Sequence, residues 1–194
     1  MRVNQILFIC MILISGCSMH KVYRQSSVVS NPYHAHKLNN NTKLRYLNSI
    51  NAARSHGRSC GSAGYFSSAP ALKWSDALYK AAYEHSNDMK KNNHFSHRGS
   101  NSSSDWTAKV QHLKRGSSFK ERIENNGYKA WKHIAENIEG GSSSEEAAIA
   151  HWLQADRHCA NIMNPLFTDV GMAHVENRGS QISHFWTQTF AAHQ

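Results

Sequence analysis

An unbroken apolar run near the amino terminus decides where this chain folds and how much of it can belong to a folded domain. The run covers residues 6–14, follows a single arginine, and leads directly into Ser15-Gly16-Cys17. A helix that spans a bilayer needs roughly 20 apolar residues, whereas the core of a secretory signal needs roughly 7 to 15. The sequence therefore predicts a cleaved export signal over residues 1–16 and folding outside the cytoplasm.

The order Ile14-Ser-Gly-Cys17 resembles the lipobox of bacterial lipoproteins, in which the cysteine is acylated and becomes the mature amino terminus. We therefore expect Cys17 to carry the lipid. Each buried methylene of an acyl chain contributes about 0.8 kcal/mol, so several chains anchor a protein firmly in a membrane. Ser18, rather than an aspartate after the cysteine, favours the outer membrane in a host that has one. The alternative is an ordinary cleaved signal followed by an incidental cysteine.

The chain has four cysteines, and the export signal divides them. Cys10 leaves with the signal and Cys17 takes the lipid, so Cys60 and Cys159 remain as a pair in an oxidising compartment. A disulfide between them would close a loop of about 100 residues, for which the chain-entropy model gives at most about 4.7 kcal/mol. It would also hold the backbone next to His158. The alternative is two buried free thiols.

The charge balance favours anionic partners. The formal net charge is +9, and loss of Arg2 with the signal makes it 9 − 1 = +8, with 14 histidines able to add charge in acid. Such a balance attracts anionic surfaces. Outside a cytoplasm these are anionic lipid, lipopolysaccharide or wall polymer, and the sequence contains no recognisable nucleic-acid motif. We therefore expect a membrane partner through the lipid and no nucleic acid.

The chain after the signal divides into a tether and one domain. Residues 18–41 are polar, end in three asparagines and show neither helical nor strand periodicity. With Cys17 they form an expected flexible tether over residues 17–41, which at about 24 residues averages about 27 Å end to end. Residues 42–194 are enough for one globular domain with a hydrophobic core.

Hydrophobic periodicity predicts helices early and strands late in residues 42–194, which indicates an α+β layered domain whose helices cover a sheet. The expected helices cover residues 42–55, 75–92, 118–125 and 143–155. Thr42 caps the first, with Leu44, Leu47, Ile50 and Ala53 on one face, and Ser143 with Glu146 forms a capping box in the last. The expected strands cover residues 128–134, 170–175 and 182–191, with the last two forming a hairpin.

Eight short motifs in this order resemble the CAP superfamily, which includes cysteine-rich secretory proteins, antigen 5 and pathogenesis-related 1 proteins. The resemblance is to the bacterial SCP-like extracellular branch and implies an α/β/α sandwich with a small antiparallel sheet between helices. The motifs are Leu47-Asn-x-x-Asn-x-x-Arg54, Leu72-Lys-Trp74, His94-Phe-Ser-His97, Glu136-Asn-Ile138, Trp152, His158-Cys-Ala-Asn-Ile-Met-Asn-Pro165, Phe167-Thr-Asp-Val-Gly171 and Phe185-Trp-Thr-Gln188.

The resemblance also implies a cavity in which the family places two histidines and two acids, and which in some members holds a divalent metal such as zinc. By motif, His97, Glu136 and His158 take three of the four positions. The fourth departs from the pattern, because Trp152 is followed by Leu-Gln-Ala and leaves only Gln154 or Asp156. A metal would then rest mainly on His97 and His158, and Glu136 could instead have a structural role at a turn.

These features predict a lipid-anchored protein of the cell envelope with a cavity for a small ligand or divalent metal, in a binding role rather than as an enzyme. Two alternatives stay open: a metal-assisted hydrolase of wall or peptide substrates, and a non-catalytic surface interaction module. Nucleophilic catalysis has little support, because the sequence lacks a Gly-x-Ser-x-Gly elbow. A basic segment over residues 109–122 either grips an anionic lipid or glycan or forms a solvated surface.

Overall fold

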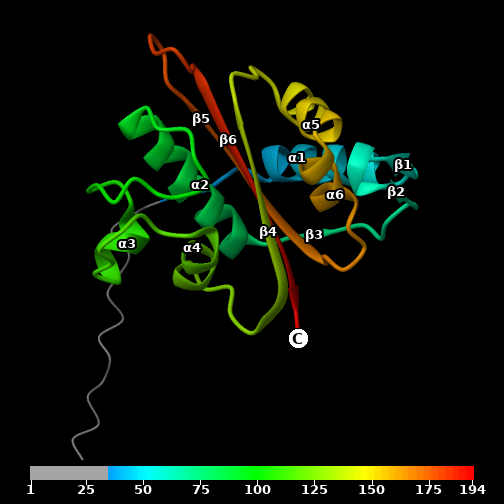
Figure 1. Cartoon of the computed structure of the whole chain (residues 1–194), viewed down its shortest axis with the longest axis horizontal. Helices are drawn as coiled ribbons and strands as arrows, with labels where there is room; N and C mark the ends of the chain where they lie inside the picture. The colour runs from blue at the N-terminus through cyan, green and yellow to red at the C-terminus, as the bar shows by residue number, and fades with distance from the viewer. Residues whose placement is uncertain (1–34) are drawn as a thin grey trace, which may run out of the picture. The chain divides into compact units, whose positions relative to one another are not determined.

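The computed structural model describes residues 35–194, in which helices lie on both faces of a four-stranded sheet (Figure 1). The export signal, Cys17 and the first part of the tether lie outside the described residues. The elements in chain order are α1 (Asn40–Arg54), β1 (Arg58–Ser59), the short 3-10 helix η1 (Gly61–Ala63), β2 (Tyr65–Phe66), β3 (Lys73–Trp74), α2 (Asp76–Asn92), α3 (Trp106–Val110), α4 (Phe119–Asn125), β4 (Trp131–Gly140), α5 (Glu145–Gln154), α6 (Asp156–Met163), β5 (Asp169–Glu176) and β6 (His184–His193).

The main sheet has the strand order β3-β5-β6-β4, and β1 pairs with β2 in a separate ribbon. The expected hairpin is confirmed, because β5 and β6 pair antiparallel from Asp169↔Ala191 to Glu176↔His184. The fold is the expected α+β class, an α/β/α sandwich. One parallel pair departs from a purely antiparallel sheet: β3 runs alongside β5, with Lys73 opposite Asp169. In this order β4 is an edge strand.

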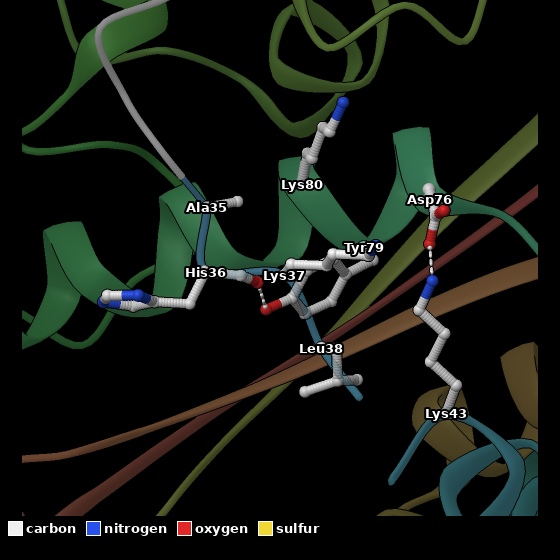
Figure 2. A pocket seen from close by; sticks show the side chains of 8 residues that line it. All are labelled: Ala35, His36, Lys37, Leu38, Lys43, Asp76, Tyr79 and Lys80. Atoms are coloured by element: carbon white, nitrogen blue, oxygen red, sulfur yellow. Dashed lines mark hydrogen bonds and ion pairs between the residues drawn. The ribbon is translucent and has the colours of Figure 1, made fainter. Parts of the chain in front are cut away.

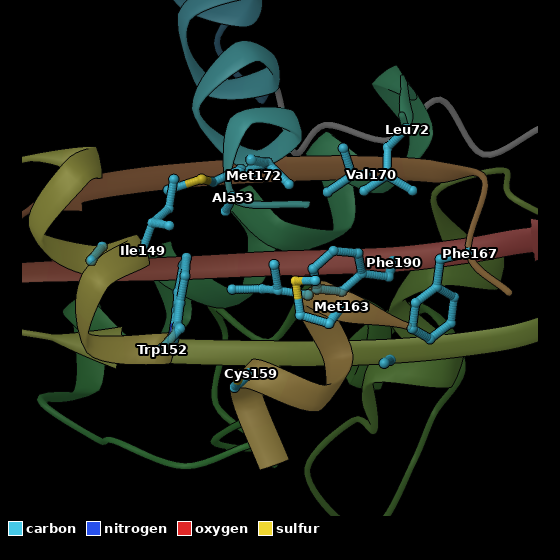
Figure 3. Packing of buried hydrophobic residues seen from close by; sticks show 14 of the residues in the cluster. Ala53, Leu72, Ile149, Trp152, Cys159, Met163, Phe167, Val170, Met172 and Phe190 are labelled. Atoms are coloured by element: carbon cyan, nitrogen blue, oxygen red, sulfur yellow. The ribbon is translucent and has the colours of Figure 1, made fainter. Parts of the chain in front are cut away.

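Successive side chains of a strand point to opposite faces of the sheet, so a hydrophobic core forms on each face. On one face, α1, α5 and α6 cover a large apolar cluster around Trp152, Trp186 and Phe190, whose packing Figure 3 shows in part. On the other face α2 lies directly on β5 and β6. That approach requires Gly171, because a Cβ at this position would lie 2.0 Å from the backbone nitrogen of Tyr79 in α2.

Two expected helix caps are wrong, one by three residues and one by a single residue. Asn39, not Thr42, caps α1, and its side chain accepts a hydrogen bond from the Thr42 backbone N–H. Ser144, not Ser143, caps α5, so the expected capping box with Glu146 does not form there. In both places several cap-forming residues stand in a row, and the register of the buried helix face decides which one is used.

The buried face of α1 also differs from the expected one. Tyr46, Ile50 and Ala53 are buried, whereas Leu44 is 56% exposed. At about 100° per residue, Leu44 lies on the opposite side of the helix from Tyr46. An aromatic residue therefore directs this helix into the core in place of the leucine.

The segment around the second histidine motif forms structure that the periodicity does not reveal. The expected strand over residues 128–134 is wrong in its bounds, because β4 begins at Trp131 and continues through Glu136 to Gly140. Residues 156–163 form a separate helix, α6, which ends before Asn164-Pro165. The expected disulfide between Cys60 and Cys159 is present, with Cα atoms 5.4 Å apart, and ties α6 to the segment after α1.

Among residues 35–194, no helix combines the length and the apolar character needed to cross a bilayer.

Candidate functional site

The candidate site is built on the edge strand β4, around the side chain of Glu136. Arg122 from α4 and His85 from α2 approach this carboxylate from the helix layer that covers one face of the sheet. The side chains of both Glu136 and His85 are fully buried. The carboxylate oxygens of Glu136 therefore lie inside the protein and are not exposed at its surface.

Arg122 neutralises Glu136 by direct contact. Its Nη2 lies 2.8 Å from Oε2 and 3.1 Å from Oε1 of the carboxylate, and Arg122 is itself 1% exposed. The same guanidinium donates to the backbone carbonyls of Ser117 and His97, at 2.9 and 3.0 Å. A buried charge is tolerated when it is paired and its remaining hydrogen-bonding groups find partners. Arg122 pairs the charge of Glu136 and His97 supplies a further contact to Oε1, while the buried Nε of Arg122 itself has no hydrogen-bond partner.

The ionisation states of Glu136 and His85 follow from their burial beside Arg122. Burial by itself would raise the pKa of Glu136, but Arg122, His85 and the hydrogen bond from His97 outweigh it and lower that pKa to about 2. Burial and the nearby Arg122 charge lower the pKa of His85 to about 3. At neutral pH the site therefore contains an ionised Glu136 and a neutral His85, whose Nε2 contacts the Ser96 carbonyl at 2.8 Å.

His97 connects this buried pair to the surface. Its Nδ1 lies 3.0 Å from Oε1 of Glu136, and its side chain is 49% exposed. An ionised carboxylate can only accept hydrogen bonds, so Nδ1 must donate. In the neutral ring Nε2 then carries no proton and is an acceptor. Glu136 thus fixes the tautomer and the orientation of His97.

His158 reaches the same region from the opposite helix layer. It lies on α6, and its ring centroid is 6.5 Å from that of His97. The Asn137 side chain donates to the His158 carbonyl at 3.2 Å, and Asn161 contacts Asn137 at 2.8 Å, so α6 is held against β4 next to the disulfide of Cys159. Burial, followed by the proximity of His97, lowers the pKa of His158. The ring is therefore neutral at neutral pH.

The structure thus brings together the three side chains singled out in the sequence, His97, Glu136 and His158. Two further members, Arg122 and His85, are not identified as site residues from the sequence. His85 lies on the buried face of α2, which indicates burial but not a role. Arg122 belongs to a basic segment that is expected at the surface, and its position directly before the buried Ile123 is the only signal that it points inward.

The residues do not fit a metal held by two histidines and two acids. Both oxygens of Glu136 contact Arg122, and one of them also contacts His97. Asp156, the displaced candidate for the second acid, accepts hydrogen bonds from the backbone and hydroxyl of Ser62. Within residues 35–194 no group of three or more His, Cys, Asp or Glu side chains is arranged to hold a metal ion. Any metal here would depend on the two imidazoles.

A separate hollow of about 260 Å³ lies where residues 35–38 run along α2 (Figure 2). The Tyr79 hydroxyl donates to the His36 carbonyl at 2.7 Å. Lys43 and Asp76, which both line the hollow, form an ion pair at 2.7 Å. The exposed Leu44 lines an adjoining apolar hollow together with Leu47 and Trp74. These contacts place the end of the expected tether against the domain, away from His97 and His158.

Helices on both faces of a short sheet, with two histidines over a buried acid at its edge strand, define an α/β/α sandwich of the CAP type. The chain belongs to the cysteine-rich secretory protein (CAP) family, whose model matches residues 47–190. This match covers the sheet, both helix layers and every residue of the candidate site.

Two curated proteins similar to this chain are from Bacillus subtilis. Over 119 residues the chain is 33% identical to the uncharacterized protein YkwD of Bacillus subtilis, covering 61% of this chain and 38% of that protein. It is 30% identical over 101 residues to the uncharacterized membrane protein YlbC of the same organism, covering 52% and 25%. The chain thus matches well under half the length of these relatives.

Among solved structures, an outer surface protein of Borrelia burgdorferi is similar with a TM-score of 0.56. The two chains are 16% identical, and the match covers 82% of this chain and 98% of that one. At this identity the similarity concerns the fold alone.

Proposed function

We propose that this chain is an exported protein of the cell envelope, held by lipid on Cys17, that uses its CAP domain to bind a small ligand at His97 and His158. The observation that carries the proposal is the hydrogen bond from Nδ1 of His97 to the buried, ionised Glu136. It leaves the exposed ring nitrogen of His97 as an acceptor. The family match and the apolar run before Cys17 support the envelope location.

The chemistry of the two rings suggests what kind of ligand fits. Burial lowers the pKa of His158, so that ring is neutral at neutral pH, and the buried Glu136 and Arg122 cancel one another's charge, so the site presents imidazole nitrogens without a strong field. Such a surface suits a neutral or cationic molecule that donates hydrogen bonds through hydroxyl or amino groups. Each hydrogen bond to a neutral partner contributes about 0.5–1.5 kcal/mol, so loss of one ring weakens binding by up to about tenfold.

Native mass spectrometry with metal analysis of the full chain, purified from its own envelope, tests the ligand site. The wild-type chain should carry a bound small molecule that the His97→Gln/His158→Gln variant lacks. His94→Gln/His133→Gln is the matched control, since it removes two histidines outside the site and should retain the ligand. If the wild-type and control chains carry one zinc ion per chain and the site variant carries none, the site is a metal site on two imidazoles and not a small-molecule site. Equal ligand content in all three chains would contradict both.

Metabolic labelling tests the anchor independently. Labelled palmitate should enter the wild-type chain and be absent from Cys17→Ser, which should also fail to partition with membranes. Absence of label from the wild-type chain would contradict the anchor and leave the ligand site unaffected. Fractionation of inner and outer membranes then tests the outer-membrane location that Ser18 favours.

One observation favours hydrolysis as a second candidate function. A histidine held by an ionised carboxylate is the arrangement of a general base, and His97 is exposed enough to reach a water molecule. The full chain, incubated with peptidoglycan fragments and a peptide library, should then show turnover that His97→Gln lacks and His94→Gln keeps. Equal product from the two variants, or none from the wild-type chain, would contradict this candidate.

A further inference from the structure

Residues 99–117, here called the serine loop, form the longest stretch between two major elements of the domain and include only the short helix α3. The sequence leaves open whether this part of the chain is a loose surface loop. In the structure its two ends meet, because the Gly99 backbone N–H donates to the Ser117 carbonyl at 2.9 Å. Long loops in compact domains are usually functional or disordered, so the way this one is held decides between the two.

Two buried carboxylates hold the serine loop: Asp88 ties it to α2, and Asp105, which lies within the loop, ties its parts to one another. Asp88 of α2, 2% exposed, accepts from the Ser100 backbone at 2.8 Å and from the hydroxyls of Ser100 and Ser104. Asp105, 1% exposed, accepts from the backbone nitrogens of Asn101, Ala108 and Ser117 at 2.9–3.2 Å. Buried carboxylates with this many donors hold a backbone in one arrangement. The serine loop is therefore a preformed surface.

That surface contains a cavity of about 380 Å³ with a cationic lining. Its basic side chains are Lys109, His112 and Lys114, and all three are exposed. Within the part of the chain that the structure describes, no carboxylate lines the cavity and none forms an ion pair with these three. By contrast, the adjacent Arg115 is paired with both oxygens of Glu121, at 2.7 and 2.9 Å. The lining is completed by Asn101, Ser102, Ser103, Ala108 and Leu113.

We propose that this cavity binds the phosphate groups of a phosphorylated glycan of the cell envelope. Two ammonium groups supply positive charge, and the imidazole and the neighbouring amide and hydroxyls supply directed hydrogen bonds to phosphate oxygens and sugar hydroxyls. A site that is ordered beforehand loses little conformational freedom when it binds. The proposal does not depend on the site at His97 and His158, with which the cavity shares no residue.

A glycan fits this surface better than a lipid bilayer. A protein that docks on a bilayer inserts large apolar side chains beside its basic residues. None of the large apolar side chains exposed in residues 35–194 lies in the serine loop; they are Leu44, Tyr65, Phe95 and Leu166. The cavity therefore offers charge and hydrogen bonds, and its apolar lining residues, Ala108 and Leu113, are not among the exposed large apolar side chains of residues 35–194.

Calorimetric titration of the full chain at about 0.1 M salt, where surface charges are screened beyond about 10 Å, tests the proposal. The probes are tripolyphosphate, a phosphorylated oligosaccharide with its unphosphorylated counterpart, and vesicles of phosphatidylglycerol in phosphatidylcholine. Lys109→Gln/Lys114→Gln should bind the phosphorylated probes at least about tenfold more weakly, because it removes two charge-assisted contacts. Lys129→Gln/Lys132→Gln removes the same charge from exposed positions outside the cavity and should bind within about twofold of the wild-type chain.

Three results would overturn the proposal. Equal weakening in both double variants would show that binding follows net charge and not the cavity. Binding to the vesicles without binding to the soluble phosphorylated probes would assign the surface to a bilayer. Equal affinity for the phosphorylated and unphosphorylated oligosaccharides would exclude phosphate as the recognised group. All four substituted lysines are exposed, so the variants fold as the wild-type chain does, which circular dichroism checks.

Discussion

At the scale of single residues, Arg122 determines what Glu136 can do. A buried carboxylate without a partner would take up a proton or open to solvent, and neither state could hold His97 by an ionic hydrogen bond. Because Arg122 contacts both oxygens, Glu136 stays ionised and directs the donor nitrogen of His97 inward. Glu136 is therefore a positioning residue, and the exposed part of the site consists of imidazole.

The buried ion pair leads to a double-mutant prediction. Arg122→Met and Glu136→Gln should each lower the free energy of unfolding by about 3 kcal/mol or more, because each leaves a buried charge unpaired. The double variant should lose less than the sum of the two by at least about 1 kcal/mol, since neither member of the ion pair is left there as an unpaired buried charge. Urea denaturation of the four chains gives these values.

An exposed ion pair provides the control for that cycle. Arg178 contacts Glu176 at 3.0 Å on the surface, with the arginine side chain 87% exposed. The cycle of Arg178→Gln and Glu176→Gln should show coupling below about 0.5 kcal/mol. If the coupling energy between Arg122 and Glu136 is equally small, the buried ion pair does not keep Glu136 ionised as inferred here.

The sequence predicts part of this site for a definite reason. His97, Glu136 and His158 lie in short motifs whose order is shared by a family, so their proximity can be inferred without any geometry. Arg122 has no such motif, and a basic residue among Lys114, Arg115 and Lys120 reads as part of a solvated face. Only the packing of α4 against β4 shows that one of these cations is buried.

At the scale of elements, the contact between α2 and β5 determines how closely the two layers approach. Gly171 lies in the middle of β5, where its missing side chain lets the first turn of α2 touch the strand. The sheet register then places the buried Thr189 opposite Gly171, and the Thr189 hydroxyl donates to the Leu78 carbonyl of α2 at 2.9 Å. One glycine thus positions the helix that carries His85 and Asp88.

Gly171→Ala should therefore be strongly destabilising. The new Cβ would lie 2.0 Å from the backbone of Tyr79, which cannot move without shifting α2, so we expect a loss of about 2–4 kcal/mol in urea denaturation. Gly140→Ala is the matched control in a strand, because there the nearest atoms, at 3.2 Å, belong to the side chains of Ile182 and Phe95. Loss of less than about 1 kcal/mol is expected at position 140. Similar losses at the two positions would contradict the role given to Gly171.

The existence of these elements was easier to predict than their bounds. The hairpin of β5 and β6 follows from alternation and a polar turn, and both are local signals. The first turn of α1 depends on whether Tyr46 or Leu44 faces the core, and the length of β4 depends on its pairing with β6. These are tertiary contacts, so periodicity in a short window could not reveal them.

At the scale of the whole domain, the disulfide and the buried ionisable groups join the two helix layers to the sheet. Cys60 and Cys159 connect α6 to the segment after α1, while His85 and Glu136 connect α2 to β4. The buried ionisable groups make this arrangement sensitive to acid. The pKa values of His85 and Glu136 are both lower in the folded chain than in the unfolded chain. In acid the unfolded chain therefore binds more protons than the folded one.

The stability of the domain should therefore fall as the pH decreases from 7. The pKa of His85 drops from 6.5 to about 3 on folding, so its contribution is lost progressively below pH 6.5. That of Glu136 drops from 4.5 to about 2, so its contribution is lost below pH 4.5. Burial raises the pKa of Glu84, which acts in the opposite direction above pH 4.5. The difference between the wild-type chain and a His85 variant separates these effects.

His85→Gln preserves a donor for the Ser96 carbonyl and removes the titrating ring. Between pH 7 and pH 5 the wild-type chain should lose about 2 kcal/mol more of its free energy of unfolding than the variant does, because only the wild-type chain gains a proton at position 85 on unfolding. Below pH 4.5 both chains also lose the contribution of Glu136, and the difference between them should keep widening until about pH 3, the pKa of His85 in the folded chain. Urea denaturation at pH 7, 6, 5 and 4 measures the difference. A constant difference between the chains from pH 7 to 5 would mean that His85 is protonated in the folded domain, and the neutral state inferred for His85 beside Glu136 would then be wrong.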